Sequence, residues 1–155
     1  MPQMNQGGKF IFGKSLVRED GSLRLPPQAV REYDMTSEGR LYLFTGSQST
    51  GGFCVTRKGL LEPSALGGIL RDLPELRGYT AAEETFLRYK GRAYAWLPVD
   101  ADGIVKLRKE TLDFLGLPPG MELLSIRSSN IAFTMGAKGP LIARAAGAPG
   151  ELEVY

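Results

Sequence analysis

The sequence contains no histidine and a single cysteine, Cys54, which stands in the apolar run Phe53–Val55. Without histidine, the commonest general base and metal ligand is missing, so catalytic sets that depend on histidine are excluded. A lone cysteine cannot form an intramolecular disulfide, and we expect it to be a buried structural thiol in a reducing compartment. The sequence therefore predicts a protein that is not an enzyme and uses no cofactor or metal.

Long apolar runs are missing as well. No stretch of apolar residues is long enough to cross a membrane as a helix. The segment Met1–Gln6 also lacks the basic and then apolar pattern of a signal peptide. We therefore expect a cytoplasmic protein with no membrane partner.

Neither sign of charge dominates the chain. It has 19 basic and 17 acidic side chains, which gives a formal net charge of +2. The excess lies in residues 9–60, which carry eight basic and five acidic side chains. A polyanion depends on local clusters of charge more than on the total. Any surface for nucleic acid is therefore expected on the first third of the chain.

What the chain does contain is an internal repeat. The hexapeptide DGSLRL of Asp20–Leu25 returns as DGIVKL in Asp102–Leu107. Each copy is followed by a short helical pattern, a turn glycine and an apolar strand: Pro26–Tyr33, Gly39 and Leu41–Phe44 in the first copy, and Arg108–Leu115, Gly120 and Leu123–Ile126 in the second. A fixed order of such features indicates a tandem duplication.

Each copy is predicted to form two strands, a helix and two further strands. The aspartate and glycine at the start of each hexapeptide favour a tight hairpin turn, because glycine accepts a positive φ. Residues 9–17 have the aromatic and β-branched content of the strand before that turn. Gly46–Gly52 and Ser128–Asn130 are predicted to be polar hairpin loops.

The stretch between the copies is predicted to be helical. Pro63–Arg71 and Thr80–Lys90 have helical patterns, and Thr80 and Glu83 have the spacing of a capping box. We therefore divide the chain into a first repeat at 9–60, a helical connector at 61–90 and a second repeat at 91–146, with flexible ends at 1–8 and 147–155.

These elements define the predicted fold class, which is mainly β with short helices (α+β). One β-β-α-β-β unit is too small to bury a core alone. Two units that exchange hairpins share one core, as a homodimer of single units does between chains. We therefore expect two intertwined swapped-hairpin units that form a pseudo-dimeric barrel.

The pattern Asp-Gly-x-x-x-Leu, helix, turn glycine and β-hairpin resembles the swapped-hairpin AbrB family, which includes the MazE antitoxins, SpoVT and the double-repeat MraZ proteins. The resemblance covers residues 9–60 and 92–142. It implies a prokaryotic, cytoplasmic transcriptional regulator that binds double-stranded DNA and needs no cofactor. In this family basic residues of the first hairpin and the helix start contact the duplex.

The residues that the resemblance places on DNA are Lys14, Arg18, Arg24, Arg31, Lys106, Arg108 and Lys109. An arginine fork can bind phosphate or guanine in a bidentate way, whereas lysine offers a point charge. The family usually has Gly-Arg directly after the turn, but here Ser22 and Ile104 follow the two glycines.

Three alternatives stay open. The cations can be an ordinary solvated surface, paired with Glu19, Asp20 and Glu110. The same fold can serve as a protein-interaction module, an antitoxin-like or assembly partner, and it can pair as a homodimer. A small-ligand β-barrel is the third alternative, and it requires a deep apolar pocket.

Two weaker motifs are better explained without a ligand. Gly8–Ser15 matches the phosphate-loop expression, but apolar, strand-like residues replace the turn and the following helix that phosphate binding needs. Asp100 and Asp102 lie on alternate residues of a turn, and we expect them to cap that turn instead of binding a metal.

Overall fold

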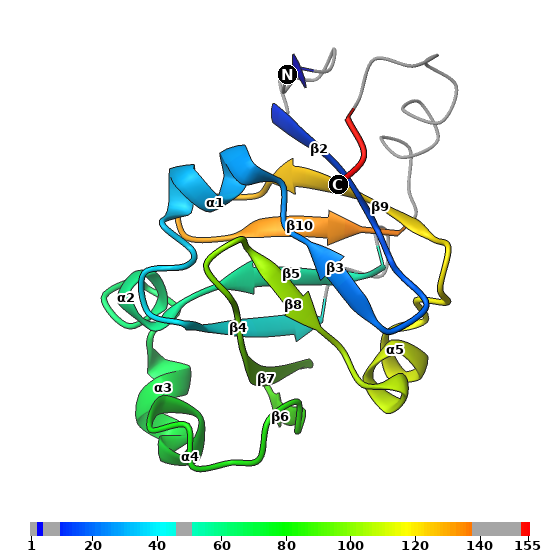
Figure 1. Ribbon diagram of the computed structural model, residues 1–155. Helices are drawn as coiled ribbons and strands as arrows, with labels where there is room; N and C mark the ends of the chain where they lie inside the picture. The colour runs from blue at the N-terminus through cyan, green and yellow to red at the C-terminus, as the bar shows by residue number, and fades with distance from the viewer. Residues whose placement is uncertain (1–2, 5–9, 46–50, 138–152) are drawn as a thin grey trace.

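The computed structural model describes residues 3–4, 10–45, 51–137 and 153–155 (Figure 1). It is mainly β with short helices, which confirms the predicted α+β class. Its elements in chain order are β1 (Gln3–Met4), β2 (Phe10–Leu16), β3 (Ser22–Arg24), α1 (Pro27–Tyr33), β4 (Arg40–Thr45), β5 (Phe53–Thr56), α2 (Lys58–Leu61), α3 (Gly68–Asp72), α4 (Pro74–Arg77), β6 (Leu87–Tyr89), β7 (Arg92–Pro98), β8 (Ile104–Lys106), α5 (Lys109–Leu115), β9 (Glu122–Arg127) and β10 (Phe133–Gly136).

The two repeated segments contain the same elements in the same order. The first half, residues 9–60, supplies β2, β3, α1, β4 and β5. The second half, residues 91–146, supplies β7, β8, α5, β9 and β10. In each half the first two strands are joined by a turn whose glycine, Gly21 or Gly103, has a positive φ of 83° or 78°. The local sequence therefore produces the same hairpin and helix twice.

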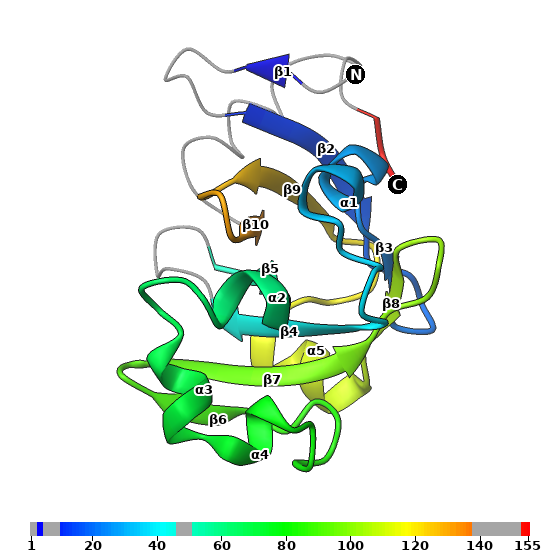
Figure 2. The same cartoon turned by 90° about the vertical axis from the view of Figure 1, so that its left-hand side faces the viewer.

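Strands of the two halves interleave in one sheet. Its order is β1-β2-β9-β10-β5-β4-β7-β6, which Figure 2 shows from top to bottom. The first strand of each half, β2 or β7, thus pairs with a strand of the other half. Leu16 lies opposite Glu122, and Pro98 lies opposite Arg40. Leu16 and Pro98 occupy equivalent positions in the two halves, and so do Arg40 and Glu122. The two pairings therefore have the same register at these positions, and a β-bulge in β2 interrupts the match further along the strand.

The remaining two strands, β3 and β8, form an antiparallel ribbon of their own. Two further hydrogen bonds extend this ribbon into the hairpin turns. The amide of Leu25 donates to the carbonyl oxygen of Gly103, and the amide of Leu107 donates to the carbonyl oxygen of Gly21, both over 2.9 Å. The turn of each half is therefore fastened to the strand of the other half.

Two apolar clusters lie on opposite faces of the sheet. The cluster under the ribbon includes Phe12, Leu23, Leu25, Leu41, Val55, Val105, Leu107, Leu112 and Phe133. The cluster under the connector includes Tyr42, Phe44, Leu61, Ile69, Leu70, Leu76 and Tyr94. The ribbon therefore lies on one side of the sheet and helices α2 to α4 on the other (Figure 2).

The predicted helix Thr80–Lys90 is wrong. Residues 80–86 are irregular, and β6 pairs with β7 in place of a helix. The amide of Glu84 donates to the carbonyl oxygen of Trp96 over 2.9 Å, so the chain already follows β7 before β6 begins. A capping box stabilises a helix only where one follows, and pairing with β7 prevails here. The predicted helix Pro63–Arg71 is also displaced, since α2 ends before Pro63 and α3 begins at Gly68.

Short segments near both chain ends lie beside β2. β1 pairs with Phe10 and Ile11 of β2, and Val154 forms a parallel bridge with Lys14. The part of the Gly46–Gly52 loop at 46–50 lies outside the described residues. So do residues 8 and 9 of the phosphate-loop match, and the described remainder of that match belongs to β2.

None of the helices in the described ranges is long and apolar enough to cross a membrane. The eight-stranded sheet is open, because among the described strands its edges β1 and β6 do not pair with each other.

We expect Gly21→Ala to be far more destabilising than Gly39→Ala. Both glycines have a positive φ, 83° and 72°, which costs an alanine about 1 to 2 kcal/mol. A methyl group at Gly39 meets nothing within 4 Å, whereas one at Gly21 overlaps the carbonyl oxygen of Leu107. The total cost at Gly21 should reach about 2 to 5 kcal/mol. Urea unfolding of the two variants measures the difference, and equal losses would contradict the close approach of the turn to the opposite strand.

Candidate nucleic-acid interface

The outer face of the ribbon is formed by the outward side chains of β3 and β8. Along β3 and β8, Leu23 and Val105 point into the core and are fully buried. Side chains alternate along a strand, so the residues on either side of these two point outward. The outward residues are Ser22, Arg24, Ile104 and Lys106.

Arg24 and Lys106 occupy equivalent positions of the two halves. Because Leu23 lies opposite Val105, the pairing places the two cations symmetrically about that central pair. The Arg24 backbone is held by Ser15, whose hydroxyl donates to the Arg24 carbonyl oxygen over 2.5 Å. The Arg24 guanidinium Nε donates to the carbonyl oxygen of Asp102 over 3.3 Å. The ribbon therefore presents one cation from each half on a single surface.

Arg18, Arg31 and Lys109 are exposed on segments next to the ribbon. Arg18 belongs to the first hairpin turn, where its amide donates to the carbonyl oxygen of Ser22 over 3.0 Å. Arg31 lies in the last turn of α1, where a positive charge is favourable. Lys109 is the first residue of α5. None of these three forms an ion pair with a carboxylate of the described residues.

The structure does not bring Lys14 to this surface. Its neighbour Ser15 is buried and bonds to the ribbon, so Lys14 points to the opposite face of the sheet. There its ammonium group lies 3.8 Å from a carboxylate oxygen of Glu122. Of the remaining candidates, Arg24 and Lys106 lie on the ribbon, Arg18 in the first turn, Arg108 and Lys109 at the start of α5, and Arg31 in the last turn of α1. Lys14 is separated from the ribbon by the sheet.

Arg108 reaches the surface but is held by the connector. Its Nε lies 3.6 Å from Oε2 of Glu84, and its guanidinium also donates to the carbonyl oxygens of Glu83 and Glu84, both over 3.4 Å. In addition, the amide of Arg108 donates to Oε1 of Glu84 over 2.8 Å. The Glu84 side chain is only 6% exposed. Glu84 thus satisfies a free amide at the start of α5, a role that nothing in the sequence indicated.

Carboxylates stand among the cations. Oδ1 of Asp20 accepts hydrogen bonds from the amide and the hydroxyl of Ser22, and these bonds hold the pKa of Asp20 below its usual value. Oδ1 of Asp100 accepts the amides of Asp102 and Ile104, both over 2.9 Å. The predicted turn-capping role of Asp100 is therefore confirmed. Both turns hold a negative charge beside the ribbon.

A shallow groove of about 850 Å³ runs along β8, between the ribbon and the turn at Glu83 and Glu84. Lys106, Arg108 and Lys109 line it, but so do four carboxylates, namely Asp20, Glu83, Glu84 and Asp100. Because Ser22, Ile104 and Lys106 of the ribbon's outer face also line the groove, the surface around Lys106 is mixed in charge. Arg24 does not line the groove.

We expect Glu84→Ala to lower the free energy of unfolding by about 1 to 3 kcal/mol, because it leaves the amide of Arg108 without its acceptor. Glu84→Gln should retain most of that stability, since the amide oxygen can still accept. Glu83→Ala is the matched control, because Glu83 is exposed and contacts Arg108 only through its backbone oxygen. Chemical denaturation compares the three variants, and equal stability of the two alanine variants would disprove the capping role.

The described residues contain no group of three or more acidic or cysteine side chains that could hold a metal ion. Cys54 is a buried free thiol, as predicted. No protein-family model matches the chain, and neither a curated protein nor a solved structure matches it.

Proposed function

We propose that the chain is a DNA-binding protein of the swapped-hairpin type, similar to the AbrB family, and that it acts in transcription regulation. The crosswise pairing supports this proposal, because β2 and β7 each lie beside a strand of the other half. In this interpretation the open sheet and the ribbon are the two walls of a pseudo-dimeric barrel, and the cluster that contains Phe12 and Leu23 fills it. The protein would be a binding protein, not an enzyme.

The observation that carries the proposal is the placement of Arg24 and Lys106. They lie on the outward face of one ribbon, at equivalent positions on either side of its central pair. Two cations at a fixed spacing can contact two phosphates of a duplex, which provides affinity, while a few base contacts provide specificity. The arginine can also reach guanine in a bidentate way.

The proposed interface is asymmetric. When the two halves are aligned on Asp20–Leu25 and Asp102–Leu107, Arg18 corresponds to Asp100, and Arg31 corresponds to Asp113. The first half therefore adds two cations where the second half has two carboxylates. Lys109 of the second half, in turn, corresponds to Pro27 of the first. The two half-sites of a DNA site would accordingly be contacted by different side chains, which suits an imperfect palindrome.

The second candidate function is a protein-interaction module on the same fold, of the antitoxin or assembly-partner kind. Two exposed apolar side chains favour it. Ile104 is 37% exposed in the middle of the cationic ribbon face, and Phe114 is 49% exposed on α5, where it stacks on Phe86 with ring centroids 4.7 Å apart. Exposed aromatic residues are enriched in protein interfaces. A stoichiometric protein that co-purifies without nucleic acid would support this function.

The DNA proposal predicts that Arg24→Gln/Lys106→Gln weakens DNA binding. Titration of a fluorescent 30-base-pair duplex of mixed sequence, followed by anisotropy at about 50 and 200 mM salt, measures it. The double variant should bind several-fold to a hundredfold more weakly, and its log–log salt slope should fall by about two, one unit for each lost phosphate contact.

The matched control is Arg71→Gln/Arg88→Gln, which removes the same charge from exposed residues of α3 and β6. It should change binding only slightly. The proposal fails if the parent chain binds no duplex at low salt, or if the two double variants weaken binding equally.

A further inference from the structure

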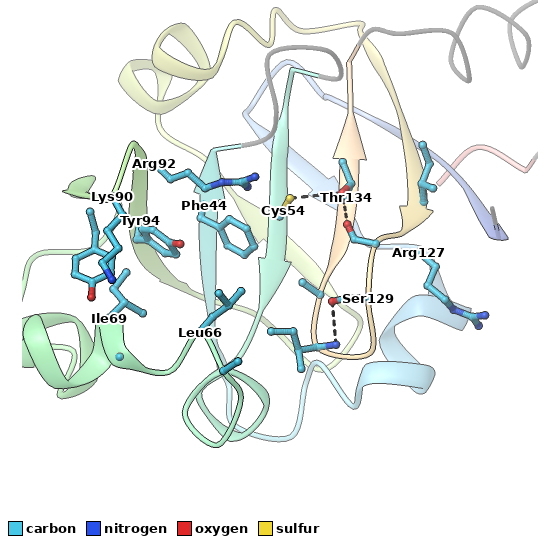
Figure 3. Close-up of a pocket in the computed structure, with 17 residues that line it drawn as sticks. Phe44, Cys54, Leu66, Ile69, Lys90, Arg92, Tyr94, Arg127, Ser129 and Thr134 are labelled. Atoms are coloured by element: carbon cyan, nitrogen blue, oxygen red, sulfur yellow. Dashed lines mark hydrogen bonds between the residues drawn. The ribbon is translucent and has the colours of Figure 1, made fainter. Parts of the chain in front are cut away.

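A second candidate site lies on the face of the sheet opposite the ribbon. It is an open hollow of about 620 Å³, a volume that suits a drug-sized ligand. Its floor consists of side chains from four strands, Phe44 of β4, Cys54 of β5, Tyr94 of β7 and Thr134 of β10 (Figure 3). Leu66, in the turn before α3, forms part of the wall. The hollow is unrelated to the cationic ribbon, from which the whole sheet separates it.

The floor favours a flat apolar group. The rings of Phe44 and Tyr94 stack with centroids 5.2 Å apart and planes inclined by 21°. Leu66 is 58% exposed at the rim, and Ile131 is half-buried on the other side. An aromatic ligand that packs on this floor would remove the exposed leucine from water and contact the edges of the two largely buried rings, which is favourable.

The charges that line the hollow are all positive. Lys90, Arg92 and Arg127 line it, and none of the lining residues among those described is a carboxylate. Arg127 pairs with Glu32, and in Figure 3 its guanidinium points away from Cys54. Lys90 and Arg92, in contrast, form no ion pair with a carboxylate of the described residues. Two cations therefore remain for an anion.

Arg92 is held in a fixed position at the edge of the aromatic floor. Its Nη1 donates to the carbonyl oxygen of Thr45 over 3.0 Å, and its guanidinium carbon lies 5.6 Å from the centroid of the Phe44 ring. A guanidinium that is already oriented loses little freedom when it binds an anionic group. The anion of a ligand stacked on Phe44 would lie beside Arg92.

A chain of polar side chains crosses the floor where β5 meets β10, one of the places where strands of the two halves pair. Sγ of Cys54 lies 3.5 Å from Oγ1 of Thr134, which lies 2.7 Å from Oγ of Ser128. Burial raises the pKa of the Cys54 thiol, so the thiol stays neutral and is not a nucleophile near pH 7. The hollow is thus equipped for reversible binding, with hydroxyl groups available to a polar edge of the ligand.

We propose that this hollow binds a small amphipathic anion, one with an aromatic body that packs against Leu66 and the floor of Phe44 and Tyr94 and an acidic group that pairs with Arg92 and Lys90. Such a ligand contacts strands of both halves. The site does not depend on DNA binding, because it uses none of the ribbon residues.

Two fluorescent probes of nearly equal shape test the charge requirement. The anionic probe 1-anilinonaphthalene-8-sulfonate and the neutral probe N-phenyl-1-naphthylamine are titrated into the folded chain without DNA. Arg92→Gln should weaken binding of the sulfonate about tenfold, the loss expected for one charged hydrogen bond, and leave binding of the neutral probe nearly unchanged. Arg88→Gln removes an exposed charge from the neighbouring strand β6, outside the hollow, and should affect neither probe.

A filling variant tests the place of binding. Ala65 is exposed and lines the hollow, so Ala65→Trp can occupy it without disturbing the buried core. It should abolish saturable binding of both probes, while far-ultraviolet circular dichroism stays that of the parent chain. The proposal is overturned if the parent chain shows no saturable sulfonate binding, if Ala65→Trp binds both probes as the parent does, or if Arg92→Gln and Arg88→Gln weaken sulfonate binding equally.

Discussion

The fold depends on two reciprocal hydrogen bonds, from Leu25 to Gly103 and from Leu107 to Gly21. Each joins the turn of one half to the strand that leaves the turn of the other half, so neither hairpin can take its place alone. Both glycines adopt the positive φ of the turn. At Gly21 the lack of a side chain also lets the opposite strand pass close, since a methyl group there would overlap the carbonyl oxygen of Leu107. The ribbon that results covers the larger core on one side and presents Arg24 to solvent on the other.

Signals that act over a few residues made part of the fold predictable. The Asp-Gly turns, the alternating strands and the two short helices could all be predicted, because each is decided by its own residues. Which strands pair is decided by packing between segments about 80 residues apart, and no local pattern specifies it. The same limit explains the error at Thr80–Lys90. The spacing of Thr80 and Glu83 suits a helix, but the edge of β7 offered Leu87–Tyr89 a full strand partner.

The candidate site shows the same division. Arg24 and Lys106 could be nominated from the family resemblance, since both follow an Asp-Gly turn at equivalent positions. The sequence could not show that Arg108 pairs with Glu84, because Glu84 comes from the distant connector. It also could not show that Lys14 faces the opposite side of the sheet, which follows from the hydrogen bond of its neighbour Ser15 to the ribbon. The hollow was beyond prediction for the same reason, since its floor requires the final strand order.

A chain with two similar halves can differ between them in a way that a homodimer cannot, and the connector is the clearest example. It follows β5 and occurs once, so α2 to α4 pack over β4 and β7 without a matching set of helices over β9 among the described elements. Because these helices pack on only part of one face of the sheet, the neighbouring part of that face is left open beside them. The helices end over β5 and β10, and the hollow with Cys54 and Thr134 on its floor lies there. The ribbon thus follows from what the two halves share, which is the same hairpin. The hollow follows from where they differ, because only one of them is followed by the helical connector.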